Sequence, residues 1–181
     1  MTRAAGMRPL VLGLLVVAAL VLQTSLVPHL TWRGVGPDLV LLVVVACGLA
    51  YGSREGMLIG FAAGLLVDLA PPSDHVAGRW ALALLAVGYV AGRVRPDGSP
   101  SWGTTVVAAA ACSFFGASLF ALSGLILADH VGAVPALLDV VLAGVVADVV
   151  LAALLLGRIT RGLRRISHRD RLEAVRVHGY A

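Results

Sequence analysis

The sequence predicts an all-α integral membrane protein, a bundle of about six short transmembrane helices. Of its 181 residues, 59% are of the apolar types AVILMFWYC and only 13% are charged, and the mean hydropathy is +0.94. Soluble domains contain about 45–50% apolar residues, so the composition lies outside the soluble class. Charged and turn-forming residues also divide the chain into apolar segments, and the arginines alternate between them. Both patterns are typical of a multi-pass membrane protein.

The first predicted helix covers residues 9–27 and follows Arg3 and Arg8. Its apolar run is long enough to cross a bilayer. No A-x-A cleavage pattern follows this run, and several further apolar segments do, so we interpret it as a retained helix and not as a signal peptide.

The next three predicted helices are 37–51, 55–70 and 79–92. Their uncharged stretches are short, and at a rise of about 1.5 Å per residue they fall below a hydrocarbon thickness of about 30 Å. We therefore expect a compact bundle in which neighbouring helices cover the charged ends. Two longer segments, 102–128 and 135–157, complete the set of six.

The orientation follows from the fourteen basic residues, all of which are arginine. With a cytoplasmic N-terminus, twelve of them fall on the cytoplasmic side, and only Arg33 and Arg79 fall outside. Cytoplasmic loops carry the excess of positive charge, so both termini are expected in the cytoplasm, which requires an even number of spans. The expected organisation is a transmembrane domain, 1–157, and an arginine-rich cytoplasmic tail, 158–181.

Several classes of function lack their chemistry in this chain. The absence of lysine excludes a Walker A loop, a Schiff-base lysine and an S-x-x-K nucleophile, and neither H-E-x-x-H nor G-x-S-x-G occurs. The net charge of +4 lies between apolar segments, unlike the exposed basic groove of a nucleic-acid binder. Cys47 and Cys112 lie within apolar runs and are interpreted as small core residues. We predict no enzyme, no cofactor and no metal site.

Glycines at four-residue spacing mark two of the short segments. They are Gly56, Gly60 and Gly64 in the segment 55–70, and Gly88 and Gly92 in the segment 79–92. Such stripes let two helix backbones approach closely within lipid. Intramolecular helix packing is the favoured interpretation, and a partner or homodimer interface is the alternative.

Acidic residues collect at the expected outer ends of the helices. Asp38 opens a helix, where the macrodipole stabilises an anion, but Asp68 closes one and is expected to need a donor such as Arg79 or Arg33. An acid at this level is costly against lipid and should face protein or water. Five side chains are therefore candidates for an outer rim that contacts a partner: Gln23, Asp38, Asp68, Asp74 and Arg79.

Asp148 lies near the middle of the last predicted helix, where an ionised carboxylate is most costly. It could serve a proton or cation relay, or it could be a single buried acid bonded to a neighbouring helix. The second interpretation is favoured because no second carboxylate lies one turn away, and Asp139 projects from the opposite face.

Beyond Gly157 the arginines recur at helical spacing, opposite an apolar face that includes Ile159 and Leu163. This pattern predicts a basic amphipathic helix on the anionic cytoplasmic leaflet. Docking of a cytoplasmic partner explains the same residues equally well. The membrane-surface candidates are Arg158, Arg161, Arg165 and Arg169.

A series of short motifs in a fixed order resembles the MreD family of rod shape-determining membrane proteins. The motifs are Leu22-Gln23-Thr24-Ser25, Gly36-Pro37-Asp38-Leu39, Gly52 with Gly56, Gly60-Phe61-Ala62-Ala63-Gly64 running on to Asp68, and Gly88-Tyr89-Val90-Ala91-Gly92-Arg93. The match is most specific over residues 22–93, and the long arginine-rich tail departs from the family pattern.

The resemblance implies a non-enzymatic scaffold in the bacterial inner (plasma) membrane that supports cell shape and peptidoglycan synthesis. Its implied partner is the single-span protein MreC, and through MreC the MreB filament, the glycosyltransferase RodA and the elongation transpeptidase. The resemblance also implies a fold similar to the membrane subunits of energy-coupling-factor transporters. The alternative function is therefore a substrate-binding subunit of a vitamin or small-molecule transporter. That alternative requires several polar side chains that converge inside the bundle.

Overall fold

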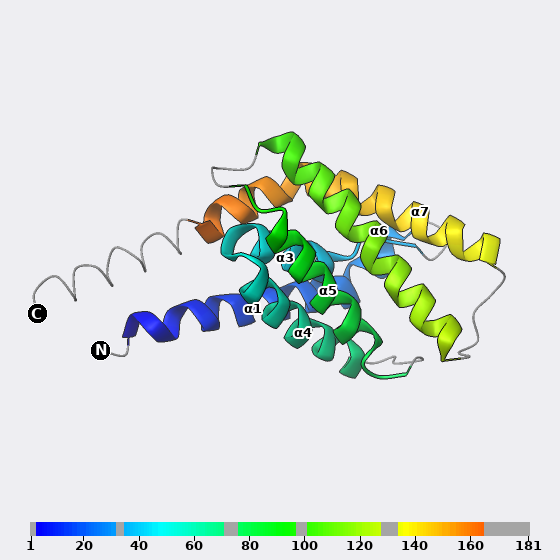
Figure 1. Ribbon diagram of the computed structural model, residues 1–181, viewed down its shortest axis with the longest axis horizontal. Helices are drawn as coiled ribbons and strands as arrows, with labels where there is room; N and C mark the ends of the chain where they lie inside the picture. The colour runs from blue at the N-terminus through cyan, green and yellow to red at the C-terminus, as the bar shows by residue number, and fades with distance from the viewer. Residues whose placement is uncertain (1–2, 32–34, 71–75, 97–100, 128–133, 165–181) are drawn as a thin grey trace, which may run out of the picture.

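The computed structural model describes residues 3–31, 35–70, 76–96, 101–127 and 134–164, and the regular elements of these segments are helices (Figure 1). Six are long, and α2 is a short helix of four residues. Their bounds are α1 Arg3–Ser25, α2 Val27–Leu30, α3 Leu39–Tyr51, α4 Ser53–Leu69, α5 Arg79–Arg93, α6 Trp102–Ile126 and α7 Val134–Leu151, and α7 continues through the π-helical segment η1, Ala152–Leu156, to Arg164. The predicted all-α fold with six principal helices is confirmed.

Three stretches of helix are long and apolar enough to cross a membrane: Pro9–His29, Trp102–Ile126 and Leu138–Arg164. The helices α3, α4 and α5 have 13, 17 and 15 residues. At about 1.5 Å per residue they are shorter than a hydrocarbon core of about 30 Å. Helices of unequal length therefore share one bundle.

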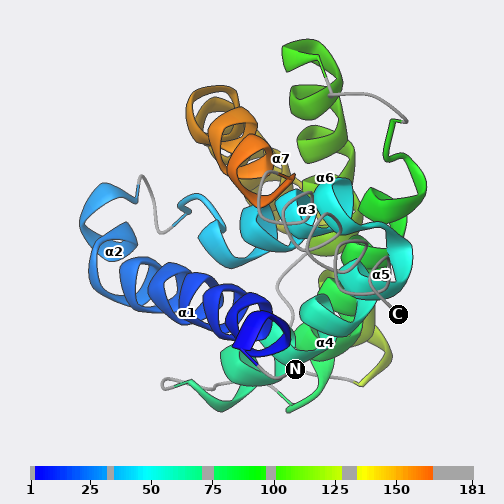
Figure 2. The same ribbon diagram turned by 90° about the vertical axis from the view of Figure 1, so that its left-hand side faces the viewer.

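Helix α3 forms the centre of the bundle. Every residue from Val40 to Ala50 is buried, and α3 contacts α1, α4, α5, α6 and η1 (Figure 2). A helix that is apolar on all sides is suited to such a fully buried position. It ends at Gly52, whose φ of 99° lies in the left-handed region that glycine adopts without strain. Helix α4 starts at the next residue, so the chain reverses in very little space.

The glycine stripe lies where α4 packs against α5. A Cβ added at Gly60 would overlap the backbone carbonyl of Leu84, and one added at Gly56 would overlap the carbonyl of Gly88. The glycines of α5 are equally close to the backbone of α4, and a Cβ at Gly88 would meet the carbonyl of Gly56. In this structure both stripes serve packing within one chain, where small residues let two backbones touch.

The last helix continues beyond Gly157, where the tail was expected to begin. Thr160 and Leu163 are buried, and the Leu163 carbonyl accepts a hydrogen bond of 3.1 Å from the Tyr51 hydroxyl. The Arg164 guanidinium donates to the carbonyl of Leu49 at 2.8 Å, so it caps the C-terminal end of α3. The packed bundle therefore includes the first residues of the predicted tail.

Two of the four membrane-surface arginines lie in this continuation. Arg158 and Arg161 are exposed, and each donates to a carbonyl one turn earlier in its own helix. Arg165 and Arg169 lie outside the described residues. The contact of the exposed arginines with lipid head groups stays a prediction.

Candidate functional site

A cavity of about 410 Å³ lies at the N-terminal end of α3, between α1, α3, α5, α6 and α7. The short central helix explains this space. Helix α3 is about 20 Å long, whereas the 25 residues of α6 span about 37 Å. The lining is mostly aliphatic, with two aromatic side chains, Trp80 and Phe120. Six residues with polar or charged side chains also line it: Gln23, Thr31, Asp38, Arg79, Ser113 and Asp148.

At one end of the cavity two carboxylates lie beside each other. Asp148 from α7 is 3% exposed, and its Oδ1 accepts a hydrogen bond of 2.6 Å from the backbone N–H of Asp38. Its Oδ2 accepts from the Ser113 hydroxyl of α6 at 2.5 Å. Tertiary packing therefore joins Asp38 and Asp148, which are 110 positions apart in the sequence.

The same end of the cavity satisfies the first backbone amides of α3. The Asp38 Oδ1 accepts from the N–H of Leu41 at 2.9 Å, as expected for an N-cap residue. The Gln23 Oε1, from α1, accepts from the N–H of Val40 at 3.0 Å. Side chains from three helices thus replace the water that would otherwise bind the start of α3.

Arg79 lines the other end of the cavity with two aromatic rings. Its Nε donates to the Ser123 hydroxyl at 3.1 Å, and a terminal nitrogen donates to the Phe120 carbonyl at 2.8 Å. The guanidinium carbon lies 4.0 Å from the centre of the Phe120 ring, which stacks on Trp80 at 4.5 Å. These contacts hold the charge between α5 and α6, where it is 7% exposed.

Asp68 lies outside the cavity lining and caps the start of α5. Its Oδ2 accepts from the N–H groups of Gly78 and Ala81, at 2.9 and 3.0 Å, and its Oδ1 accepts from Trp80 at 3.1 Å. The side chain is 3% exposed. Asp68 was expected to need a donor because it closes α4, and backbone amides of α5 provide three hydrogen bonds.

Most of the outer-rim candidates thus lie inside the bundle and not on an exposed rim. Gln23, Asp38 and Arg79 face a shared cavity, Asp68 is buried beside it, and Asp74 lies outside the described residues. Whether any of them contacts a partner stays a prediction.

The bond from Ser113 agrees with the interpretation of Asp148 as an acid bonded to a neighbouring helix. However, a second carboxylate does lie next to it. Helical spacing indicates neighbours within one helix only, so the sequence pattern gives no sign that Asp38 lies next to Asp148.

The cavity also contains residues that sequence reasoning missed: Ser113, Trp80 and Phe120. The available signal was a hydroxyl in the middle of a long apolar helix. Ser113 is 2% exposed, and a buried hydroxyl within a membrane requires a hydrogen-bond partner.

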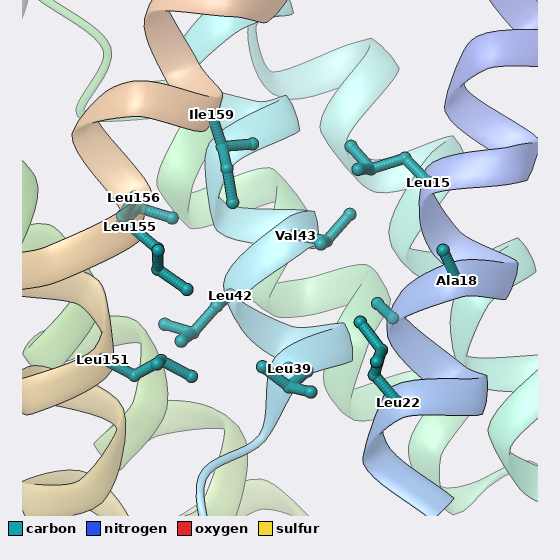
Figure 3. A pocket seen from close by; sticks show the side chains of 11 residues that line it. Leu15, Ala18, Leu22, Leu39, Leu42, Val43, Leu151, Leu155, Leu156 and Ile159 are labelled. Atoms are coloured by element: carbon teal, nitrogen blue, oxygen red, sulfur yellow. The ribbon is translucent and has the colours of Figure 1, made fainter. Parts of the chain in front are cut away.

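A second, smaller hollow of about 150 Å³ lies between α1, α3 and the segment from Leu151 to Ile159 (Figure 3). Leu15 and Leu22 of α1 face Leu155 and Ile159 across the surface of α3. We call this hollow the aliphatic groove. Its lining consists of Leu15, Ala18, Ala19, Leu22, Leu39, Leu42, Val43, Leu151, Leu155, Leu156 and Ile159.

Together, these features define an all-helical membrane protein that encloses a cavity with polar ends and displays an aliphatic groove. The sequence model of the family described as rod shape-determining protein MreD matches residues 6–156, which is most of the chain. The protein therefore belongs to the MreD family and is a rod shape-determining membrane protein. Comparisons with the curated proteins and with the solved structures find no match.

Proposed function

We propose that this protein is a non-enzymatic scaffold subunit of the bacterial cell-elongation complex, which binds an MreC-like protein and supports peptidoglycan synthesis. The observation that carries this proposal is the MreD family match over residues 6–156. Through that partner the scaffold would work with the MreB filament, RodA and the elongation transpeptidase. The strong asymmetry of the arginines supports six crossings of the inner membrane with both termini in the cytoplasm.

The aliphatic groove is the surface that best fits the single span of such a partner. Inside lipid, apolar surface gives no hydrophobic driving force between helices, so association depends on close van der Waals packing. A groove offers more contact to an inserted helix than a convex helix face does. The groove also has small residues, Ala18 and Ala19, on one wall, which allow close approach.

Photo-crosslinking tests this position with controls one residue away. Leu15 and Leu155 line the groove, whereas their neighbours Leu14 and Leu154 are 61% and 59% exposed and are not part of the lining. A photoreactive residue at Leu15 or Leu155 should give an adduct with the MreC-like protein in cells, and one at Leu14 or Leu154 should not. Equal adducts from all four positions, or adducts only from the two controls, would place the partner elsewhere.

The transporter alternative gains one observation, because the cavity does contain converging polar side chains. Gln23, Ser113 and Asp148 come from α1, α6 and α7, whereas Arg79 opens α5 and Asp38 caps the start of α3. Purification from gently solubilised membranes separates the two functions. Recovery of an MreC-like protein supports the scaffold, and recovery of a paired ATPase with a coupling subunit supports the transporter.

A further inference from the structure

The cavity at the N-terminal end of α3 has the size and the lining of a small-molecule site. Its volume of about 410 Å³ lies within the roughly 300–1,000 Å³ of ligand pockets, which are mostly apolar with a few convergent polar groups. A water or a single metal ion needs far less space, since one water occupies about 30 Å³ of liquid. The space and the aliphatic walls therefore favour an organic ligand.

The polar groups are separated along α6. Ser113 marks the end with the two carboxylates, and Phe120, seven positions later, marks the end with Arg79. Seven residues of helix correspond to about 10 Å. A ligand that fills the cavity would place one polar group beside Asp38 and Asp148, and its apolar part would run along Ala117 and Gly144 toward Trp80 and Phe120.

The charge at the carboxylate end of the cavity determines whether the polar group of the ligand should be a cation or an anion. When both are ionised, the two carboxylates carry two negative charges, and the N-terminus of α3 offsets only about half a charge. A cation bound beside them stabilises this ionised form, which burial alone disfavours. Among the described residues that line the cavity, the cation is Arg79, and it lies at the far end. The four oxygens of the two carboxylates keep unused acceptor capacity, because a carboxylate accepts about four hydrogen bonds.

We infer that the cavity binds an amphipathic molecule through a protonated amino group, whose N–H groups donate hydrogen bonds to the Asp38 and Asp148 carboxylates. The rest of the molecule occupies the aliphatic and aromatic part of the cavity. The amino group can belong to a free organic amine or to the head group of an aminophospholipid. This site is independent of the proposed partner contact, because the aliphatic groove has its own lining on α1, α3 and the end of α7.

Equilibrium binding of radiolabelled phenethylamine to the full chain in phosphatidylglycerol nanodiscs tests the inference. Phenethylamine is a cation at neutral pH, and 2-phenylethanol is its uncharged analogue of nearly the same shape. Saturable binding is expected, with competition by 2-phenylethanol at least about tenfold weaker, since burying a charge-assisted bond discriminates by about 1.5 kcal/mol or more. Absent binding, or equal competition by the alcohol, overturns the inference. If sodium chloride displaces the labelled phenethylamine as effectively as unlabelled phenethylamine does, the inference is also overturned, because an inorganic cation would then be the occupant.

Two variants and one control locate the probe. Asp148→Asn should weaken phenethylamine binding at least about tenfold by removing one of the two charges. Gly144→Leu should abolish binding by filling the cavity, and it keeps both carboxylates. Asp139→Asn changes an exposed acid of the same helix and should bind like the unmodified protein. Unchanged binding in both cavity variants, each verified as folded by thermal melting, would place the probe elsewhere and refute the site.

The lipid composition separates the two sources of the amine. If the head group of an aminophospholipid occupies the site, nanodiscs that contain phosphatidylethanolamine will suppress phenethylamine binding. Equal binding in both kinds of nanodisc will identify a free amine as the ligand. Because purified protein is used without any partner, failure here leaves the proposed scaffold function standing.

Discussion

The first backbone N–H groups of α5 and of α3 both need hydrogen-bond acceptors, and the α4–α5 pair and the region around the start of α3 supply them in different ways. Between α4 and α5, glycines bring the two backbones into direct contact. Both carboxylate oxygens of Asp68 accept hydrogen bonds from the backbone N–H groups at the start of α5. At the start of α3, side chains from several helices satisfy the backbone, and a cavity remains. One part of the bundle is therefore closely packed, whereas the other part contains a cavity.

The largest effect is expected where the backbones touch. In Gly60→Leu the new side chain would collide with the Leu84 carbonyl, which belongs to a rigid helix, so the loss of stability should reach about 3 kcal/mol. Thermal unfolding in detergent and the monodisperse fraction measure it. Gly13→Leu in α1 is the control, because no atom lies within 4 Å of its added Cβ. Identical melting of the two variants would contradict the α4–α5 contact.

An intermediate loss of stability is expected at the helix-capping aspartates, and it should be larger for Asp68 than for Asp38. Asp68→Asn keeps one acceptor oxygen where both oxygens now accept backbone N–H groups, so the folded state should lose about 1.5–3 kcal/mol. Asp38→Asn should lose less than about 1 kcal/mol, because Asn is an equally good N-cap residue. Urea or thermal unfolding compares the two. If Asp68→Asn is fully stable yet recovers less of the MreC-like partner, Asp68 belongs to the contact rim instead.

The smallest effect is expected in the cavity. The nearest atom to a Cβ added at Gly144 is Val35 Cγ1 at 3.8 Å, an ordinary van der Waals distance. Gly144→Ala should therefore change stability by no more than about 0.5 kcal/mol. The same exchange at Gly64 would press against the backbone of Ala81 and should lower the melting temperature clearly. Similar melting shifts for both alanine variants would show that the cavity is as tightly packed as the α4–α5 contact.

Local sequence signals predicted four of the helices closely, whereas α1 begins six residues before the predicted segment 9–27 and the last helix runs seven residues past the predicted segment 135–157. Four predicted segments agree with α3, α4, α5 and α6 to within two residues at each end: 37–51, 55–70, 79–92 and 102–128. The match is good because apolar runs, capping residues such as Asp38 and turn residues such as Gly52 act within a few positions of the chain. The short helix α2, with Pro28 in its first turn, and the π-helical segment η1 were not foreseen.

The sequence by itself determined the membrane class, the six helices, the family resemblance and the presence of a small-residue stripe. Each of these depends on composition or on spacing along one segment. The tertiary structure alone decided that Asp38 lies beside Asp148, that Asp68 caps α5, and that the last helix packs as far as Arg164. Such contacts depend on the relative lengths and orientations of packed helices. A short α3 among longer helices produces both the cavity and its buried carboxylates, and no local pattern records that geometry.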